Sequence, residues 1–153
     1  MPPTLIDTSV LARLIERDSP KGRAAEKALR ESELDAAELS VCSQVLTEFW
    51  VVATRPPESN GYGLDPVDAD ACIVDFLDSF TLLPDPPDLF ELWREIVVAH
   101  KVRGKQAHDG RLVALIRAFA GHRVLTFNAR DFRRYADIDV IVPTVDPQSS
   151  SPP

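Results

Sequence analysis

The sequence of 153 residues lacks the features that mark several classes of protein. It has only two cysteines, Cys42 and Cys72, and neither stands near a second Cys or a His cluster, which argues against a disulfide framework and a zinc site. No apolar run approaches the roughly 18 residues of a membrane span. The first residues, MPPTLID, lack a basic region and reach an Asp too early for a signal peptide. These absences predict a reduced, cytoplasmic protein with no membrane contact.

Positive charge is also scarce, because the net charge of −7 at pH 7 gives the whole chain little attraction for nucleic acid. The cations are nevertheless concentrated, since 10 of the 17 Lys and Arg residues lie between Arg94 and Arg134. A basic segment on an acidic body is suited to contact phosphates. It is also typical of solvated helix faces, and charge alone leaves both interpretations open.

Length and composition favour one globular domain. A hydrophobic share of 44% in a chain of 153 residues is enough to bury a core. We expect the domain to cover residues 1–143. The remaining residues, 144–153, include the stretch VDPQSSSPP and are expected to form a disordered tail.

Short apolar strands alternate with helical patterns along the chain. Strands are predicted at residues 4–7, 38–42, 80–83, 123–126 and 140–142. Helices are predicted at residues 9–17, 21–33, 44–54, 65–79, 87–101 and 109–120, with Ser43 as the cap of the third. Strands separated by helices predict a three-layer α/β/α fold with a mainly parallel central sheet of four to five short strands.

Asp7 stands where the first predicted strand ends, in the stretch LIDTSVL. An Asp at such a place is typical of a helix cap. It is also where a site can form, because ligands of open parallel sheets bind beyond the carboxyl ends of the strands. The fourth strand ends at Thr126-Phe127-Asn128, so two polar strand ends are expected to converge at one edge of the sheet.

Two further acids lie on or beside apolar helix faces. Glu48, in VLTEFWVV, falls beside an apolar stripe, where it either pairs with Arg55 or faces a site. Asp109, in HDGRLVALIRAFA, lies along the predicted buried stripe, where an unpaired carboxylate is costly without a cation or strong donors. Three inward carboxylates suit Mg²⁺, which prefers oxygen ligands. Such an ion would support hydrolysis of a phosphodiester by a metal-activated water.

Four ordered motifs resemble those of a known family: LIDTSVL, the Glu of SQVLTEFW, GKQAHDGRLVAL and LTFNARDFRRY. They look like the motifs of PIN-domain ribonucleases, above all the VapC-like toxins of bacterial toxin–antitoxin pairs, and extend from about Pro3 to Val142. The resemblance implies three catalytic, metal-binding acids, which are Asp7, Glu48 and Asp109. It also implies three supporting polar residues, which are Thr8, Ser9 and Thr126.

The fourth acid of many PIN domains is missing at the expected place. Asn128 stands there, and its amide oxygen can bind a metal but adds no charge. Asp131 either supplies that charge through a water, caps the following turn or pairs with Arg134. A second metal ion is therefore less well supported by the sequence than the first.

Other residues are expected to contact the substrate or a partner. Candidates for RNA phosphate contacts surround the last two motifs, and they are Lys101, Arg103, Lys105, Arg130, Arg133 and Arg134. A groove for a partner peptide is expected from apolar helix residues, which are Phe49, Trp50, Leu89, Phe90 and Trp93. An Arg of that peptide would match the carboxylates and fill the site in place of a metal.

The resemblance implies a Mg²⁺- or Mn²⁺-dependent endoribonuclease that cuts structured RNA, forms a homodimer and is neutralised by a cognate antitoxin in the cytoplasm. Two interpretations from other classes stay open beside it. Asn128 is compatible with a catalytically weak PIN-fold module that binds RNA or protein. The acidic site is also compatible with a metal-dependent phosphatase acting on small phosphoesters, because the acids do not specify the size of the substrate.

Overall fold

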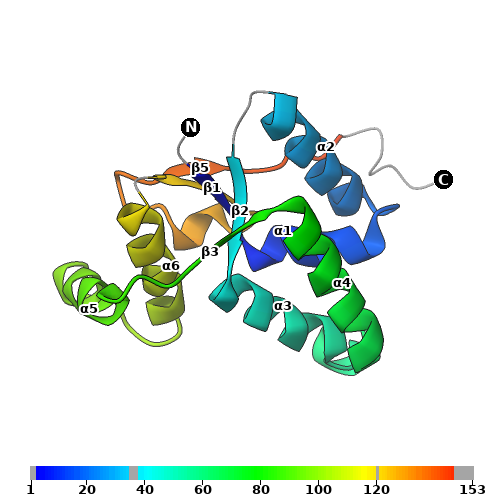
Figure 1. The fold of residues 1–153 in the computed structure, drawn as a ribbon, viewed down its shortest axis with the longest axis horizontal. Helices are drawn as coiled ribbons and strands as arrows, with labels where there is room; N and C mark the ends of the chain where they lie inside the picture. Colours follow the sequence, from blue (N-terminus) through cyan, green and yellow to red (C-terminus); the bar gives the residue numbers. More distant parts are fainter. Residues whose placement is uncertain (1–2, 35–37, 120, 147–153) are drawn as a thin grey trace.

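A computed structural model describes residues 3–34, 38–119 and 121–146 of the chain (Figure 1). Its strands form one sheet in the order β3-β2-β1-β4-β5, and every neighbouring pair is parallel. The prediction of a mainly parallel sheet of short strands is therefore confirmed. The strands are β1 (Pro3–Ile6), β2 (Glu38–Cys42), β3 (Thr81–Leu83), β4 (Arg123–Leu125) and β5 (Asp139–Ile141).

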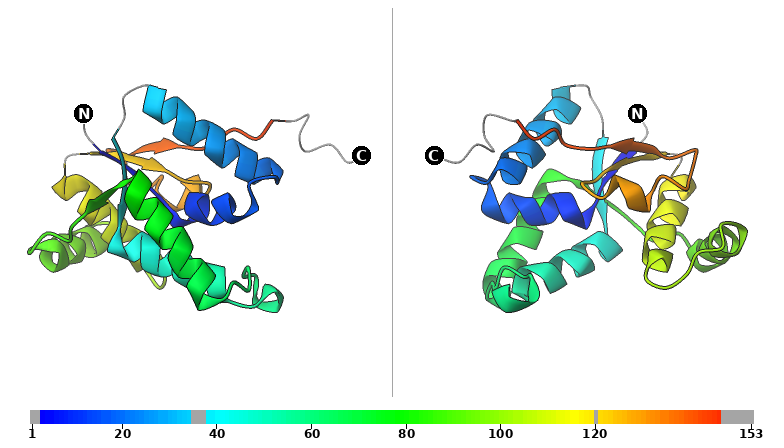
Figure 2. Two further views of the ribbon diagram at one scale, coloured as in Figure 1. Left: turned by 45° about the vertical axis from the view of Figure 1, so that its right-hand side comes forward. Right: turned by 180° about the vertical axis from the view of Figure 1, so that it is seen from behind.

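Helices cover both faces of this sheet and complete three layers. They are α1 (Thr8–Arg13), α2 (Pro20–Leu34), α3 (Ser43–Thr54), α4 (Pro66–Ser79), α5 (Leu89–Ala99) and α6 (Gln106–Ala118). Figures 1 and 2 show α5 and α6 on one side of the sheet and α1, α3 and α4 on the other, which confirms the predicted α/β/α fold. Within the described ranges, none of these helices combines the length and apolar character needed to cross a bilayer.

The order in which successive strands are added to the sheet reverses at β1. From β1 it passes to β2 and then to β3 at one edge, and after α5 and α6 it returns to β4 on the other side of β1. The connections that follow β1 and precede β4 therefore lie on opposite faces (Figure 2). Such a switch point opens a crevice at the carboxyl ends of the two strands. Asp7 follows β1 and Thr126 follows β4, so both lie at this crevice.

The apolar core fixes the positions of these elements. The inner strands bury consecutive residues, such as Leu5 and Ile6 of β1, as expected of strands that are covered on both faces. Helix α6 adds a buried run at residues 112–116. Phe49 of α3 packs edge-to-face on Phe76 of α4, with 4.9 Å between the ring centroids. The helices that carry the candidate acids are thus anchored by their apolar faces.

Some predicted boundaries differ from the observed ones. Ser43 is not the cap of α3, because the helix begins at Ser43 itself, and Cys42 takes the cap position without a side-chain bond. Strand β2 runs into α3 with no connecting residue, so Ser43 is already helical. Helix α6 begins at Gln106, which places Asp109 inside its first turn. Of the expected tail, residues 144–146 are irregular, and residues 147–153 lie outside the described residues.

Candidate functional site

An open cavity of about 710 Å³ lies at the carboxyl edge of the sheet. Its walls come from the segments that follow β1 and β4, from α3, from the first turn of α6 and from the loop at residues 60–62. All four acidic candidates line this cavity together with Asn128, and they are Asp7, Glu48, Asp109 and Asp131. The structure therefore brings together acids that lie far apart in the sequence.

Asp7 is held by two hydroxyl groups. The residue is 7% exposed, and its Oδ2 accepts hydrogen bonds from Ser9 Oγ at 2.9 Å and from Thr126 Oγ1 at 2.7 Å. The interpretation of the Asp7 carboxylate as a helix cap is wrong, because only the backbone carbonyl of Asp7 accepts bonds from the start of α1. The carboxylate instead connects the end of β1 to the end of β4.

The loop after β4 orients the two hydroxyl groups. Ser9 Oγ accepts a hydrogen bond from the backbone N–H of Phe127 at 3.0 Å, and Thr126 Oγ1 accepts one from the N–H of Asn128 at 2.9 Å. With each oxygen engaged as an acceptor, the single proton of each hydroxyl is directed to Asp7. Ser9 and Thr126 thus both contact Asp7. Thr8 also lines the cavity, and its Oγ1 lies 3.0 Å from the carbonyl oxygen of Val45.

Glu48 reaches the cavity from α3 and has no cationic partner among the described residues. Its Oε1 accepts a hydrogen bond from Gln44 Nε2 at 3.0 Å, and its Oε2 lies 3.3 Å from Thr8 Oγ1. The alternative that Arg55 pairs with Glu48 is wrong, because Arg55 Nη2 donates to the backbone oxygen of Asn60 at 3.0 Å. The Glu48 carboxylate is therefore held by neutral groups.

Asp109 has the most strongly perturbed ionisation in the cavity. It is half-buried in the first turn of α6, and burial is the main cause that raises its pKa from 3.8 to about 7. The negative charges of Asp131, Asp7 and Glu48 also raise this pKa, while the charge of Arg134 lowers it. At neutral pH, Asp109 therefore retains a proton for part of the time unless a cation enters the cavity.

Asn128 and Asp131 lie on the same wall of the cavity. Asn128 is exposed, and Asp131 ends the 3-10 segment Ala129–Asp131 that follows it. The alternative that Asp131 pairs with Arg134 is wrong, because Arg134 Nη2 donates to Gln106 Oε1 at 2.6 Å. Among the charged groups, Asp131 raises the pKa of Asp109 most. Its charge is therefore available to the cavity, as expected if it compensates for the missing fourth acid.

The chemistry of these donors fits a hard divalent cation, although their side chains do not yet converge on one point. The acids and Asn128 offer oxygen donors, which Mg²⁺ and Mn²⁺ prefer. In the described part of the chain, however, no three His, Cys, Asp or Glu side chains stand close enough together to hold an ion.

Sequence reasoning missed two cations that line the cavity, Arg13 and Lys21. Arg13 follows Ser9 by one helical turn on α1, so helical periodicity is a signal that could have found it. Lys21 Nζ lies 5.7 Å from the centre of the Phe127 ring. The cations predicted from the basic segment do not line this cavity. Lys101, Arg103 and Lys105, as well as the three arginines of residues 130–134, are exposed to solvent.

The expected peptide groove is only partly present. Phe49 is fully buried against Phe76, so its place in that groove is wrong, and the reason is that its helix face is turned to the core. Leu89, Phe90 and Trp93 do line a separate hollow of about 520 Å³. Phe90 is 61% exposed there.

The raised pKa of Asp109 predicts how pH affects the metal-free protein. Between the ordinary value of 3.8 and about 7, the folded state binds a proton that the unfolded chain has released, so the free energy of unfolding falls as pH rises. Asp109→Asn removes this titration. In EDTA, the stability of the variant relative to the wild type should therefore increase from pH 5 to pH 8, as measured by urea unfolding.

A matched control for this measurement is Asp78→Asn, on the exposed surface of α4. Its stability relative to the wild type should stay constant over the same pH range. A stability difference for Asp109→Asn that is equally independent of pH would show that the cavity does not perturb this carboxyl group.

Comparison with known proteins identifies the family of the chain. The PIN-domain family profile matches residues 4–138. Among curated protein sequences no significant match is found. A similar solved structure is VapC20 of Mycobacterium tuberculosis, described as a toxin that cleaves the sarcin–ricin loop, with 18% identity and a TM-score of 0.65. The alignment covers 86% of this chain and 95% of that chain.

Two similar structures are complexes with DNA. VapBC2 of Rickettsia felis, bound to a DNA fragment from its promoter, has 11% identity and a TM-score of 0.67, with 91% of this chain and 97% of that chain covered. FitAB bound to a DNA fragment has 17% identity and a TM-score of 0.68, with coverages of 92% and 94%. At these identities the three structures show a shared fold. The family profile extends from β1 to the residues before β5, and the chain belongs to the PIN-domain family.

Proposed function

We propose that this protein is a metal-dependent endoribonuclease that uses Mg²⁺ or Mn²⁺ and acts as the toxin of a toxin–antitoxin pair. The observation that carries this proposal is the cavity that four carboxylates line, at the switch point of a PIN-domain sheet. The carboxylates come from the residue after β1, from α3, from α6 and from the segment after β4. A cavity of this kind fits hydrolysis of a phosphodiester.

Asp7, Glu48 and Asp109 are the residues that would hold the ion. Asn128 would add its amide oxygen, and Asp131 would act through a water. When bound, the ion lowers the pKa of a water and offsets negative charge on the phosphate. Within the chain, the hydroxyl groups of Ser9 and Thr126 direct the Asp7 carboxylate, as their hydrogen bonds of 2.9 and 2.7 Å indicate.

RNA is the proposed substrate because two cations line the cavity and further cations are exposed on the segment from Arg94 to Arg134. Arg13 and Lys21 line it and can contact the phosphate at the site. The exposed cations of the basic segment can contact phosphates further along the strand, and these are Lys101, Arg103, Lys105, Arg130, Arg133 and Arg134. The similar fold of VapC20, which is described as cleaving the sarcin–ricin loop, supports structured RNA as the substrate class.

The proposed partners are a cognate antitoxin and a second copy of the chain, in the cytoplasm. The similar folds of VapBC2 and FitAB, both solved as complexes with DNA, support a toxin–antitoxin setting. An Arg from the antitoxin can relieve the repulsion among the cavity carboxylates in place of a metal ion, because a guanidinium pairs with carboxylates through two parallel hydrogen bonds.

A catalytically weak binding module is the second candidate. The observation that favours it is that the acids of the described chain do not converge as a ready-made metal site, while Asn128 removes one charge from the family pattern. Cleavage of RNA by the purified protein separates the two candidates. Cleavage of a chromogenic phosphate ester without cleavage of RNA would instead indicate the phosphatase.

Removing charge from the proposed ligands should abolish cleavage. Asp7→Asn and Asp109→Asn keep the side-chain volume and remove one negative charge each, so both should lose RNA cleavage and bind Mn²⁺ more weakly in calorimetric titration. The matched control is Asp78→Asn, on the surface of α4, which should cleave at the wild-type rate. Full cleavage by either site variant would exclude these acids as the metal ligands.

Salt should weaken RNA binding if the basic segment contacts phosphates. The logarithm of the affinity should fall with the logarithm of the salt concentration, with a slope of about −0.7 for each phosphate contacted on single-stranded RNA. Replacing Arg130 and Arg134 by Gln should make this slope shallower and should not weaken Mn²⁺ binding, because Arg134 is a positive charge near Asp109. An unchanged slope would show that both residues are solvated surface cations that contact no phosphate.

A further inference from the structure

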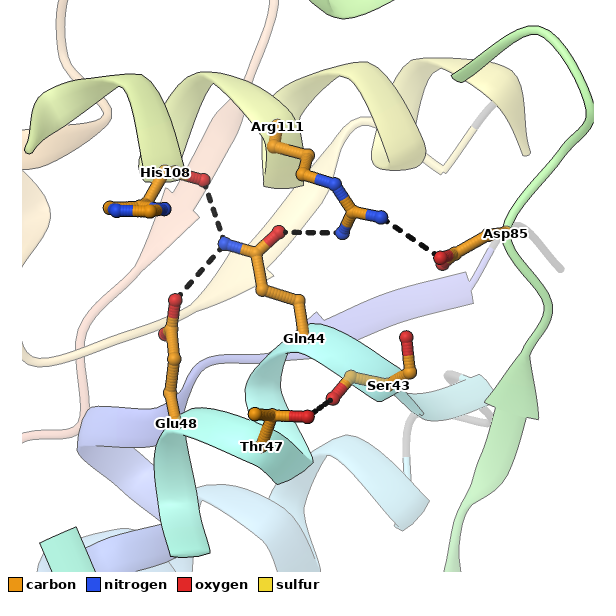
Figure 3. A network of polar contacts seen from close by, with 7 residues as sticks. All are labelled: Ser43, Gln44, Thr47, Glu48, Asp85, His108 and Arg111. Atoms are coloured by element: carbon orange, nitrogen blue, oxygen red, sulfur yellow. Dashed lines mark hydrogen bonds and ion pairs between the residues drawn. The ribbon is translucent and has the colours of Figure 1, made fainter. Parts of the chain in front are cut away.

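Gln44 connects Glu48 of α3 to residues of α6 (Figure 3). Its Nε2 donates one hydrogen bond to Glu48 Oε1 at 3.0 Å and another to the backbone oxygen of His108 at 2.8 Å. Its Oε1 accepts a hydrogen bond from Arg111 Nη1 at 3.0 Å. Gln44 and Glu48 lie on α3, whereas His108 and Arg111 lie on α6. The amide therefore joins the two helices that carry Glu48 and Asp109.

The orientation of the Gln44 amide follows from its three neighbours. A carboxylate and a backbone carbonyl can only accept hydrogen bonds, and a guanidinium can only donate them. A flipped amide would place its oxygen against Glu48 and the His108 carbonyl, and its NH₂ group against Arg111. Every contact would then be repulsive. The network thus admits one orientation, in which both amide protons are used.

Gln44 also makes the shorter of the two contacts described above for the Glu48 carboxylate. The other neighbour is Thr8, whose Oγ1 lies 3.3 Å from Glu48 Oε2 and 3.0 Å from the carbonyl oxygen of Val45. A hydroxyl has one proton, and Thr8 donates it in the shorter contact, to the carbonyl oxygen of Val45. Without Gln44, the Glu48 side chain would have little to select one rotamer at the cavity wall.

An ion pair between Arg111 and Asp85 contacts the oxygen of the Gln44 amide. Arg111 Nη2 donates to Asp85 Oδ2 at 2.9 Å, while its Nη1 donates to the Gln44 oxygen. This arrangement fixes the guanidinium between a carboxylate and the amide (Figure 3). A cationic donor on the amide oxygen polarises the amide and strengthens the hydrogen bonds that its NH₂ group donates. Asp85 and Arg111 thus reinforce the contact with Glu48 without lining the cavity themselves.

We propose that Gln44 is a positioning residue that fixes the Glu48 carboxylate against the first turn of α6, and so sets its place relative to Asp109. This inference rests on the proposed function, in which Glu48 and Asp109 share a metal ion. Gln44 touches neither the substrate nor the ion. It acts through Glu48, with the His108 carbonyl as the fixed point and the Arg111–Asp85 pair as support.

The test is a double-mutant cycle on Mn²⁺ affinity, measured by calorimetry. Gln44→Met keeps the length of the side chain and removes all three hydrogen bonds, so Mn²⁺ binding should weaken about tenfold, as is usual when a residue that orients a metal ligand is lost. In a Glu48→Ala background the same change should have little further effect, because no carboxylate remains to be positioned. An equal loss in both backgrounds, or no loss in either, would overturn the inference.

Gln106→Met is the matched control, because Gln106 lies on α6 and its amide oxygen, like that of Gln44, is paired with an arginine, yet Gln106 does not line the cavity. Its Mn²⁺ affinity should equal that of the wild type. A loss as large as that of Gln44→Met would show that any broken amide–arginine pair disturbs α6, which would overturn a specific role for Gln44.

A metal-free measurement separates this inference from the proposed function. In EDTA, the unfolding equilibrium constants of Gln44→Met, Glu48→Ala and the double variant should show a coupling of at least about twofold, since the two side chains are in direct contact. Additive effects would overturn the inference regardless of metal binding. A wild-type protein that binds no Mn²⁺ but shows this coupling would instead contradict the proposed function alone.

Discussion

Carboxylates that repel one another are held side by side at one edge of the parallel sheet, and the packing of the surrounding elements keeps them there. Four acids line one cavity, and burial together with their charges raises the pKa of Asp109 to about 7. The apolar core provides the means to hold them there, because the elements that carry them are anchored by fully buried side chains such as Ile6 and Phe49. The sheet thus keeps the acids close despite an interaction that would separate them.

Three acids meet this constraint in three different ways. Asp7 accepts hydrogen bonds from two hydroxyl groups, which are in turn oriented by the backbone after β4. Glu48 accepts a hydrogen bond from the amide of Gln44, whose oxygen accepts one from Arg111 of α6. Asp109 retains its own proton for part of the time at neutral pH. These contacts hold Asp7 and Glu48 in place at the cavity, which Asp109 also lines.

The sequence predicts the fold and the gathering of the acids, because both follow from local patterns. The apolar runs define the strands, parallel pairing brings Asp7 and Thr126 to one edge, and helical periodicity turns Asp109 inward. What the sequence does not show are contacts across the chain. The sequence does not distinguish Gln44 from other polar helix residues, because its contacts are with α6. Lys21 lines the cavity because of the path that the chain takes after α1. The sequence pattern around Phe49 is compatible with a surface groove and with a core, and in the structure Phe49 packs against Phe76 in the core.

If a divalent ion displaces the proton of Asp109, metal binding should release protons. Calorimetric titration with Mn²⁺ in buffers of different ionisation enthalpy gives the number of protons released for each ion bound. Since the pKa of Asp109 is about 7, about half a proton should be released at pH 7 and close to none at pH 9. Binding heats at pH 7 that are independent of the buffer, or no binding at all, would contradict this account.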